Sequence, residues 1–302
     1  MNTLLPDSGR LPHDLRDLER RSQALLGHDL ARHPGAAAFR SLEQSLLANI
    51  RQIQLFRQAA GAGAEIDVAR AVPAANLIKS SHELLDTVVD QIALCESTAR
   101  LSSIAAELAR RLISQQRLSY HEILPLFGRI FDEVQGVSRL SRWTPVPGLS
   151  LMSIAASSTG DADSVFFVEG LIAARVLVWT LNGESRAAER LPQVVLAALL
   201  QDVGRMLESR SGSQKRRLSP KRIEWFKRNH PSIGAALLGA IRGAPVGLAL
   251  VVGQHHERLD GRGFPRALMA RDILPAAAVL AAASRFAGMS LEFDAEPYSE
   301  FA

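Results

Sequence analysis

The amino-acid sequence predicts an all-α fold made of two successive helical regions. Ala, Leu and Arg dominate the composition and lose little conformational freedom in a helix, whereas aromatic residues make up only 5% of the 302 positions. Apolar residues recur at spacings of seven, four and four, as on one face of a helix, in the stripe Leu77, Leu84, Val88 and Ile92. The second half shows no convincing alternation with a period of two, so strands are not expected there.

The overall composition is that of a soluble globular protein, with 47% hydrophobic and 22% charged residues. The formal charge is +4 and the sequence pI is about 9.7. The densest basic run extends from Lys215 to Arg222. It is either a solvated loop face or the binding site of an anionic partner. No nucleic-acid partner is expected, because stacking aromatic residues do not accompany these charges.

The single cysteine, Cys95, excludes a disulfide framework and a thiolate zinc site. The first residues lack the charged start and apolar core of a signal peptide. No run of about eighteen uncharged apolar residues occurs, so a membrane span is not expected. The sequence therefore predicts a cytoplasmic protein.

The first region, residues 1–140, is predicted to be a helical bundle. Its helices are expected at Pro12 to Leu26, about Gly35 to Ala59, about Pro73 to Ser114 (one long helix or two consecutive ones) and Tyr120 to Val134. The bundle either has only a structural role or is an input or dimerisation module that makes the protein a homodimer. Three histidines here have no partners at metal-ligand spacing and are interpreted as incidental: His28, His33 and His82.

A boundary is predicted between about Val137 and Gly160, where proline, glycine and serine interrupt the helical pattern. The second region, residues 150–302, is again expected to be helical. Its helices are predicted at Val165 to Leu181, Leu191 to Leu207, Pro220 to Arg228, His230 to Ile241, Pro245 to His255 and Leu274 to Met289.

Three short segments of this second region carry the residue types of a metal site. One contains Asp202 at the end of an apolar helix, one contains His230, and one contains the adjacent His255 and His256. Imidazole and carboxylate groups are suitable ligands for iron, manganese or zinc. Neighbouring residues diverge by about 100° on a straight helix, so both adjacent histidines reach one ion only where the helix ends. The glycines that follow them predict such an ending.

Residues from about 150 to 300 resemble the HD-GYP domain, a branch of the HD metal-dependent phosphohydrolases associated with hydrolysis of cyclic dinucleotides, chiefly cyclic di-GMP. The segment His255-His256-Glu257-Arg258, with Asp260-Gly261 and Gly263-Phe264-Pro265 after it, is similar to the family's second signature, with Phe264 where tyrosine is usual. His230-Pro231 matches the family's HP segment. The family domain normally continues with further helices beyond the stretch similar to Glu296-Pro297-Tyr298, so the last helices are either lost or cut off here.

The resemblance implies which metal ligands are present and which are replaced. One ion of the family's two-metal site would be held by Asp202, His230, His255 and His256, which all match. The positions of the second ion's own ligands are occupied by Ser164, Gln201 and Ser284, which are poor ligands. We therefore expect at most one divalent transition metal, namely iron, manganese or zinc.

These replacements predict a degenerate HD-GYP-type signalling domain that is catalytically impaired and binds a nucleotide, a metal or a protein partner. Arg205, Arg258 and Arg262 are expected to grip the phosphates of a cyclic dinucleotide. The loop with Gly261, Gly263, Phe264 and Pro265 is expected to contact a diguanylate cyclase-type signalling protein, because the family's loop is linked to such contacts. The alternatives are a phosphohydrolase that works from a single ion or an altered site, and an adaptor whose N-terminal helices do the work.

Overall fold

The structure is a computed structural model that describes residues 16–18, 20–21, 36–60, 68–135, 151, 155, 162–183, 189–207 and 219–292. Throughout these ranges the regular elements are α-helices and short 3-10 helices, with two isolated β-bridges and no strand, which confirms the all-α fold. His28, His33 and nearly all of the predicted boundary between 137 and 160 lie outside the described residues, as does most of the predicted helix from Pro12 to Leu26.

The chain divides into two compact units. The first comprises residues 1–93 and 146–149, and the second comprises residues 94–145 and 150–302. The division lies inside helix α3 (Val68–Ile113), so the predicted region 1–140 contributes residues to both units. That this region is a separate input or dimerisation domain stays a prediction.

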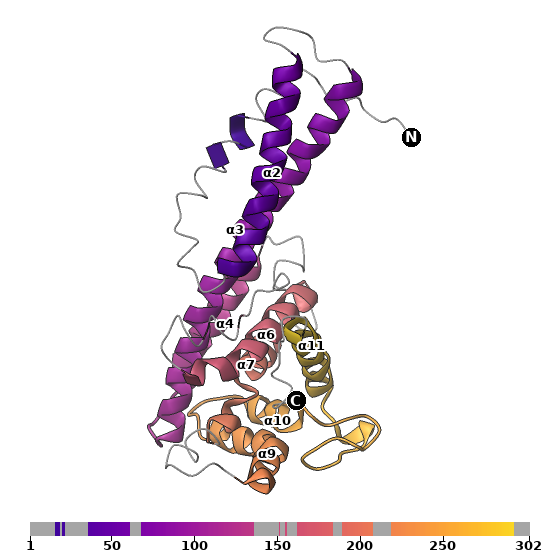
Figure 1. Cartoon of the computed structure of the whole chain (residues 1–302). Helices are drawn as coiled ribbons and strands as arrows, with labels where there is room; N and C mark the ends of the chain where they lie inside the picture. Colours follow the sequence, from indigo (N-terminus) through magenta and orange to yellow (C-terminus); the bar gives the residue numbers. More distant parts are fainter. Residues whose placement is uncertain are drawn as a thin grey trace. The chain divides into compact units, whose positions relative to one another are not determined.

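Two helices form the described core of the first unit. Buried residues spaced by seven mark the inner face of α2 (Ala36–Ala60), at Leu46 and Ile53, and the inner face of the first part of α3, at Ile78 and Leu85. Helix α3 is one continuous helix (Figure 1). It begins five residues before Pro73, which was expected at its start. The proline is tolerated there because its fixed φ suits a helix and it removes only one backbone hydrogen bond.

Helix α6 (Val168–Leu181) is the centre of the second unit. It packs against α4 (Tyr120–Val134), α7 (Leu191–Leu200) and α11 (Pro275–Glu292), and nearly all its side chains up to Val178 are buried. Because neighbours cover α6 on several sides, its sequence is apolar all round and not striped.

The same burial accounts for a membrane-like signal found among the described residues. By length and composition alone, the stretch Asp163–Leu181 could cross a membrane, with a mean hydropathy of 1.7, but 67% of it is buried inside this unit. A core helix of a globular domain passes the same test. The expectations of no membrane span and of a cytoplasmic location stay predictions.

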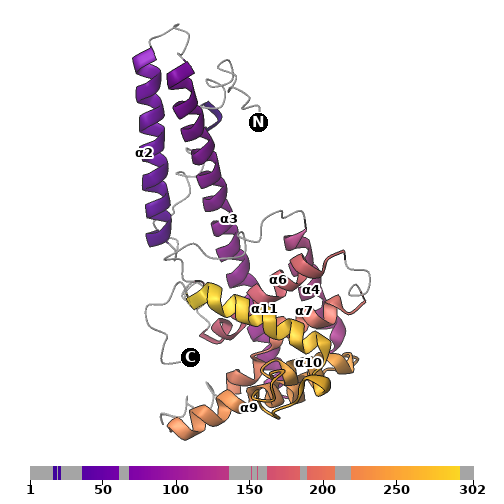
Figure 2. The same cartoon turned by 90° about the vertical axis from the view of Figure 1, so that its right-hand side faces the viewer.

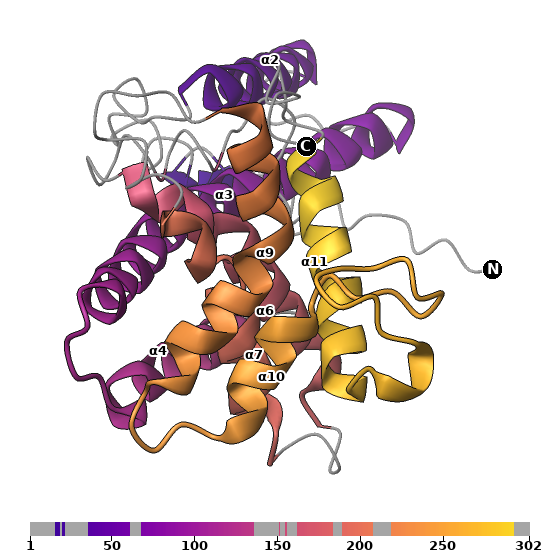
Figure 3. The ribbon, with the colours of Figure 1, turned by 90° about the horizontal axis from the view of Figure 1, so that it is seen from below.

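The remaining helices of the second unit gather beside this core. Helix α9 (Pro220–Gly239) packs against α10 (Val246–Gln254) and against the 3-10 turn η4 (Val203–Arg205). Figure 3 shows α9 and α10 with the long loop that leads from α10 through η5 (Ala270–Asp272) to α11. The ends of α7 and α10 and the middle of α9 thereby meet.

Three predicted helices differ in the structure. The helix expected from Leu191 to Leu207 ends at Leu200, where the chain turns into η4. The two helices expected on either side of Asn229 are one helix, α9, which continues through Pro231. Proline inside a helix removes one N–H donor, and a side chain supplies that donor here, as described below.

A buried arginine ties three helices of the second unit together. Arg175 of α6 is fully buried, and its guanidinium donates to both carboxylate oxygens of Glu133 on α4, at 3.2 Å each. It also donates to Ser97 Oγ at 2.7 Å and to Thr98 Oγ1 at 3.0 Å, both on α3. Burial lowers the pKa of Arg175, while the Glu133 carboxylate opposes this shift. The four polar groups fix how α3 and α4 pack on α6.

We predict that Glu133→Gln destabilises the protein by about 2 kcal/mol, because it removes the carboxylate that accepts two hydrogen bonds from the buried guanidinium. The figure is below the ~3–5 kcal/mol of fully buried pairs because the Glu133 side chain is partly exposed. Denaturant unfolding measures the effect, with the exposed neighbour Asp132→Asn as the matched control. Equal stability of the two variants would contradict the role given to this ion pair.

Candidate metal centre

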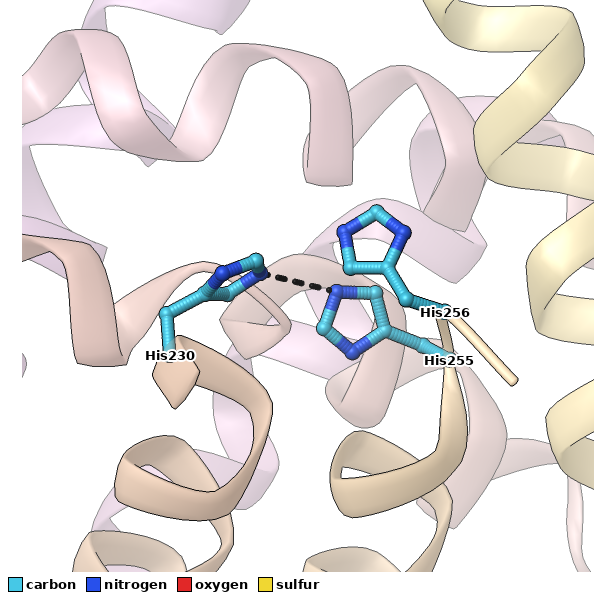
Figure 4. A group of neighbouring side chains, drawn as sticks. All are labelled: His230, His255 and His256. Carbon is cyan, nitrogen blue, oxygen red and sulfur yellow. Dashed lines mark hydrogen bonds between the residues drawn. The ribbon is translucent and has the colours of Figure 1, made fainter. Parts of the chain in front are cut away.

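Three of the predicted ligands, all histidines, lie together in the second unit. His230 comes from the middle of α9, and His255 and His256 follow the end of α10. One ligand atom from each lies within 4.8 Å of the other two. Figure 4 shows the three imidazoles grouped, with the Nε2 atoms of His230 and His255 3.3 Å apart. As expected, the two adjacent histidines converge because α10 ends at Gln254 and the chain turns at His255.

The fourth predicted ligand, Asp202, joins this group from the break between α7 and η4. Its Oδ1 lies 3.3 Å from His230 Nε2, and the carboxylate is nearly buried. Gly204 makes this approach possible, since a Cβ at that position would meet the His230 carbonyl oxygen at 2.3 Å. Burial is the largest influence on Asp202 and opposes its ionisation, but Arg205, whose Nη1 is 3.8 Å away, and the three histidines together outweigh it, so the pKa of Asp202 lies below its usual range.

Backbone carbonyls fix the protonation pattern of two imidazoles. His230 Nδ1 lies 2.8 Å from the Lys227 carbonyl oxygen, and His255 Nδ1 lies 2.6 Å from the Val252 carbonyl oxygen. A carbonyl only accepts hydrogen bonds, so each Nδ1 must carry the proton. In the neutral rings the Nε2 atoms are therefore lone-pair acceptors, which is the tautomer that binds a metal.

Pro231 explains why the Lys227 carbonyl is available to His230. In a regular helix this carbonyl would accept the N–H of the residue four positions later, which is Pro231, and proline has none. The imidazole of His230 supplies the missing donor. The histidine and the proline that follows it thus act as one unit, in which the proline releases the carbonyl that orients the histidine.

These contacts bring together three acceptors that repel one another unless a cation or a proton lies between them: Asp202 Oδ1, His230 Nε2 and His255 Nε2. Burial opposes the proton, lowering the pKa of His230 to about 4 and that of His256 to about 2. The pKa of His255 is lowered by burial too. Three neutral imidazoles and one carboxylate therefore fit a single divalent transition ion such as iron, manganese or zinc.

The positions of the second ion's expected ligands carry a different arrangement. Ser284 Oγ on α11 donates a 2.6 Å hydrogen bond to Gln201 Oε1 at the end of α7, and both side chains are buried. Ser164 is buried as well, and its Oγ donates to the Ala155 carbonyl oxygen at 3.0 Å. Two of the three replacements thus satisfy each other directly through a neutral hydrogen bond.

The loop after His256 is held by Glu257, which the sequence analysis gave no separate role. Its buried carboxylate accepts the backbone N–H of Arg266 at 2.7 Å and of Leu268 at 2.8 Å. Gly263 packs against the backbone of Glu257 and Arg258, where a Cβ would meet the Arg258 nitrogen at 2.3 Å, so only glycine fits there. In the sequence, the only sign of this role was a glutamate directly after two histidines. Its hydrogen bonds to the loop backbone become visible only in the structure.

The anchored loop turns its aromatic residue toward the histidines. The ring of Phe264 stacks on that of His256, with centroids 4.5 Å apart and 26° between the planes. Of the expected partner-contacting residues, Phe264 is therefore half-buried beside the site. The more exposed large apolar side chains of the loop are Leu259 and Met269; Met269 forms a β-bridge with Asp260, the residue after Leu259.

The three predicted phosphate-binding arginines lie in different surroundings. Arg205 is next to Asp202, with its guanidinium 5.7 Å from the ring centre of Phe166. Arg258 is paired with Asp260 through two hydrogen bonds, of 3.1 and 2.7 Å, and its side chain is 65% exposed. Arg262 is exposed in the same loop. Within the described residues, only Arg205 contacts a predicted ligand.

Comparison with known proteins agrees with this site. Residues 171–299 match a protein-family model described as "HD domain". Together with the helical fold and the cluster of histidines, this match supports the assignment of that part of the chain to the HD phosphohydrolase superfamily, whose domains bind divalent metals. No curated protein and no solved structure matched the chain.

We predict that His256→Ala abolishes stoichiometric binding of iron, manganese or zinc, because loss of one imidazole leaves too few ligands. Elemental analysis after reconstitution measures the metal content. His121→Ala, which removes an exposed histidine of α4, is the matched control and should retain the ion. Equal metal content in the two variants would exclude His256 as a ligand.

We predict that Pro231→Ala weakens metal binding by about tenfold, because its new N–H competes for the Lys227 carbonyl that orients His230. Helix stability should be unchanged or higher, since alanine is the better helix former, so the two effects have opposite signs. Chelator competition measures affinity, and nitrogen NMR of the imidazoles reports the tautomer. The exposed neighbour Ser232→Ala is the control. Unchanged affinity would refute the coupling between proline and histidine.

Proposed function

We propose that this protein is a degenerate HD-GYP-type signalling protein that retains one metal site, has lost the second, and is catalytically impaired. It would bind a nucleotide or a protein partner in cyclic di-GMP-related signalling. The observation that carries the proposal is the hydrogen bond between Ser284 and Gln201, at the positions where the family's second ion has its own ligands.

A second ion is disfavoured at these positions because both side chains are neutral and already hydrogen-bonded to each other. A divalent ion in a buried site requires anionic or imidazole ligands. Gln201 and Ser284 are neutral, and each already uses an oxygen or hydroxyl in binding the other. Insertion of a second ion would break a buried hydrogen bond and offer only weak ligands in return. The pair stabilises the contact between α7 and α11 without a cation.

The surviving residues define what the domain could still do. Asp202 and the three histidines would hold one ion, which when bound supplies a positive charge that attracts a phosphate. Arg205 lies beside Asp202 and could contact the same phosphate through its guanidinium. Phe264 closes one side of the cluster by stacking on His256, which limits access of water to that imidazole. Together these groups favour binding of a phosphate ester over its cleavage.

A second candidate is a phosphohydrolase, or a cyclic di-GMP phosphodiesterase, that works from the single ion. The convergence of Asp202, His230 and His255 favours it, because one ion and one arginine can still polarise a phosphate. It lacks the pair of ions about 3.5–4 Å apart that clamps the attacking and leaving oxygens in two-metal enzymes. We therefore expect low turnover at most.

The partner of the domain is a separate part of the proposal. A diguanylate cyclase-type protein would contact the loop that contains Gly261, Gly263 and Pro265, where Leu259 and Met269 are exposed. A homodimer through the N-terminal helices would present two such loops. Because residues 94–145 belong to the second unit, the adaptor alternative is tested by deleting residues 1–93, and loss of partner binding in that variant would favour it.

We predict that hydrolysis of cyclic di-GMP is absent, or at least about a thousandfold below that of an intact two-metal member. Loss of about 4 kcal/mol of transition-state stabilisation corresponds to this factor. Turnover is measured on anaerobically purified protein whose metal content is determined in parallel. The triple variant Ser164→His, Gln201→His, Ser284→Asp should bind a second ion and gain activity, whereas each single variant should not.

The matched control is the triple variant with Asp202→Asn, which removes the carboxylate needed by both ions and should abolish any gain. Turnover by the wild-type protein at an ordinary enzymatic rate with one ion would favour the second candidate. The same rate with two ions would show that the site is not degenerate.

A further inference from the structure

The first turns of α9 display an exposed aromatic ring outside the metal centre. Trp225 is 53% exposed, whereas the next residue, Phe226, is 6% exposed, and the two rings meet edge to face at 5.2 Å. Asn229 Nδ2 donates to the Trp225 carbonyl oxygen at 2.8 Å. The indole therefore rests against the ring of Phe226 on one side, while about half of the Trp225 residue stays exposed.

Positive charge surrounds this ring, so an exposed aromatic residue does accompany the basic run, contrary to the reason given for expecting no nucleic-acid partner. Lys221, Arg222 and Arg228 are exposed and lie three or four positions from Trp225, so they flank it on the same side of the helix. Residues 220–228 contain four cations and one acid, Glu224, and so carry a net charge of +3. We call this surface the α9 basic face.

The placement of the apolar residues argues against a lipid bilayer as the partner. The other exposed apolar residue of these turns, Ile223, is 41% exposed but lies two positions from Trp225. Two positions correspond to about 200° around a helix, so the two side chains point in nearly opposite directions. A helix that lies in a membrane interface requires one continuous apolar side.

A segment of the same chain has the complementary chemistry. Residues 293–302, which follow α11, contain three acids and no lysine, arginine or histidine, and so carry a net charge of −3, opposite to that of the α9 basic face. They also contain three aromatic residues: Phe293, Tyr298 and Phe301. We propose that segment 293–302 docks on the α9 basic face, with an aromatic side chain on Trp225 and its carboxylates on the flanking cations.

The arrangement of the second unit is compatible with this docking. Figures 2 and 3 both show the end of α11 and the beginning of α9 on the same side of the unit. Ten residues can extend over at most about 33–36 Å. Because the segment is tethered, its effective concentration at the face is high, and weak aromatic and ionic contacts suffice to hold it.

The docked segment would act on the helix that carries a metal ligand. His230 lies five residues after Trp225 on α9. A segment bound across the first turns of α9 would stabilise this helix. This inference is independent of whether the domain retains catalytic activity.

The test uses the full chain with Trp143→Phe and Trp179→Phe, so that Trp225 is the only fluorophore. Neutralising the segment with Asp294→Asn, Glu296→Gln and Glu300→Gln should increase quenching of Trp225 by acrylamide. A synthetic peptide of residues 293–302 should then bind to this variant and restore protection. The same peptide with its acids neutralised should bind roughly three- to a hundredfold more weakly, since three surface ion pairs are lost.

Charge reversal provides the matched comparison. Lys221→Glu with Arg228→Glu should expose Trp225, and further Asp294→Lys with Glu300→Lys should protect it again, whereas Arg242→Glu with Arg271→Glu should have no effect. Unchanged quenching in the neutralised protein, together with no binding of the peptide, would overturn the proposal. Protection that depends on protein concentration would assign the face to a second copy. Binding of an oligonucleotide or anionic vesicle, unaffected by the segment, would assign it to that partner instead.

Discussion

The metal centre depends on the close approach of three buried hydrogen-bond acceptors: the carboxylate of Asp202 and the Nε2 atoms of His230 and His255. Two backbone carbonyls direct the protons of both imidazoles away from this point, and burial disfavours adding another. The surrounding helices therefore hold an arrangement that a cation stabilises. The break after α7, the continuation of α9 through Pro231 and the end of α10 are each required to bring these atoms together.

The neighbouring positions, Gln201 and Ser284, carry neutral side chains that hydrogen-bond to each other. The resemblance expects ligands of a second ion at these positions, but the neutral hydrogen bond between Gln201 and Ser284 needs no cation. A half-empty charged site would leave buried groups unsatisfied, which is costly. In the proposed function, these two residues therefore replace charged ligands by a neutral and satisfied interior. This replacement is the reason for proposing a signalling domain and not a damaged enzyme.

The fold class and the helix end at the adjacent histidines could be predicted from local pattern, whereas the grouping of Asp202 and His230 with them was implied by the resemblance to the HD-GYP domain. Helical periodicity marks the elements, and two adjacent histidines followed by glycines mark a helix end. The continuity of α9 could not be predicted, because the donor that replaces the N–H of Pro231 is a side chain that becomes visible only with the structure. The role of Glu257 and the network around Arg175 depend on contacts between segments distant in sequence, which periodicity does not encode.

The central claim is that one metal site persists beside a neutralised one, and X-ray absorption spectroscopy of the metal-loaded protein tests it most directly. The account predicts one ion per chain, coordinated by about three imidazole nitrogens and a carboxylate oxygen, without a second metal in its neighbourhood. A metal–metal distance of about 3.5–4 Å in the spectrum, with two ions per chain, would contradict it.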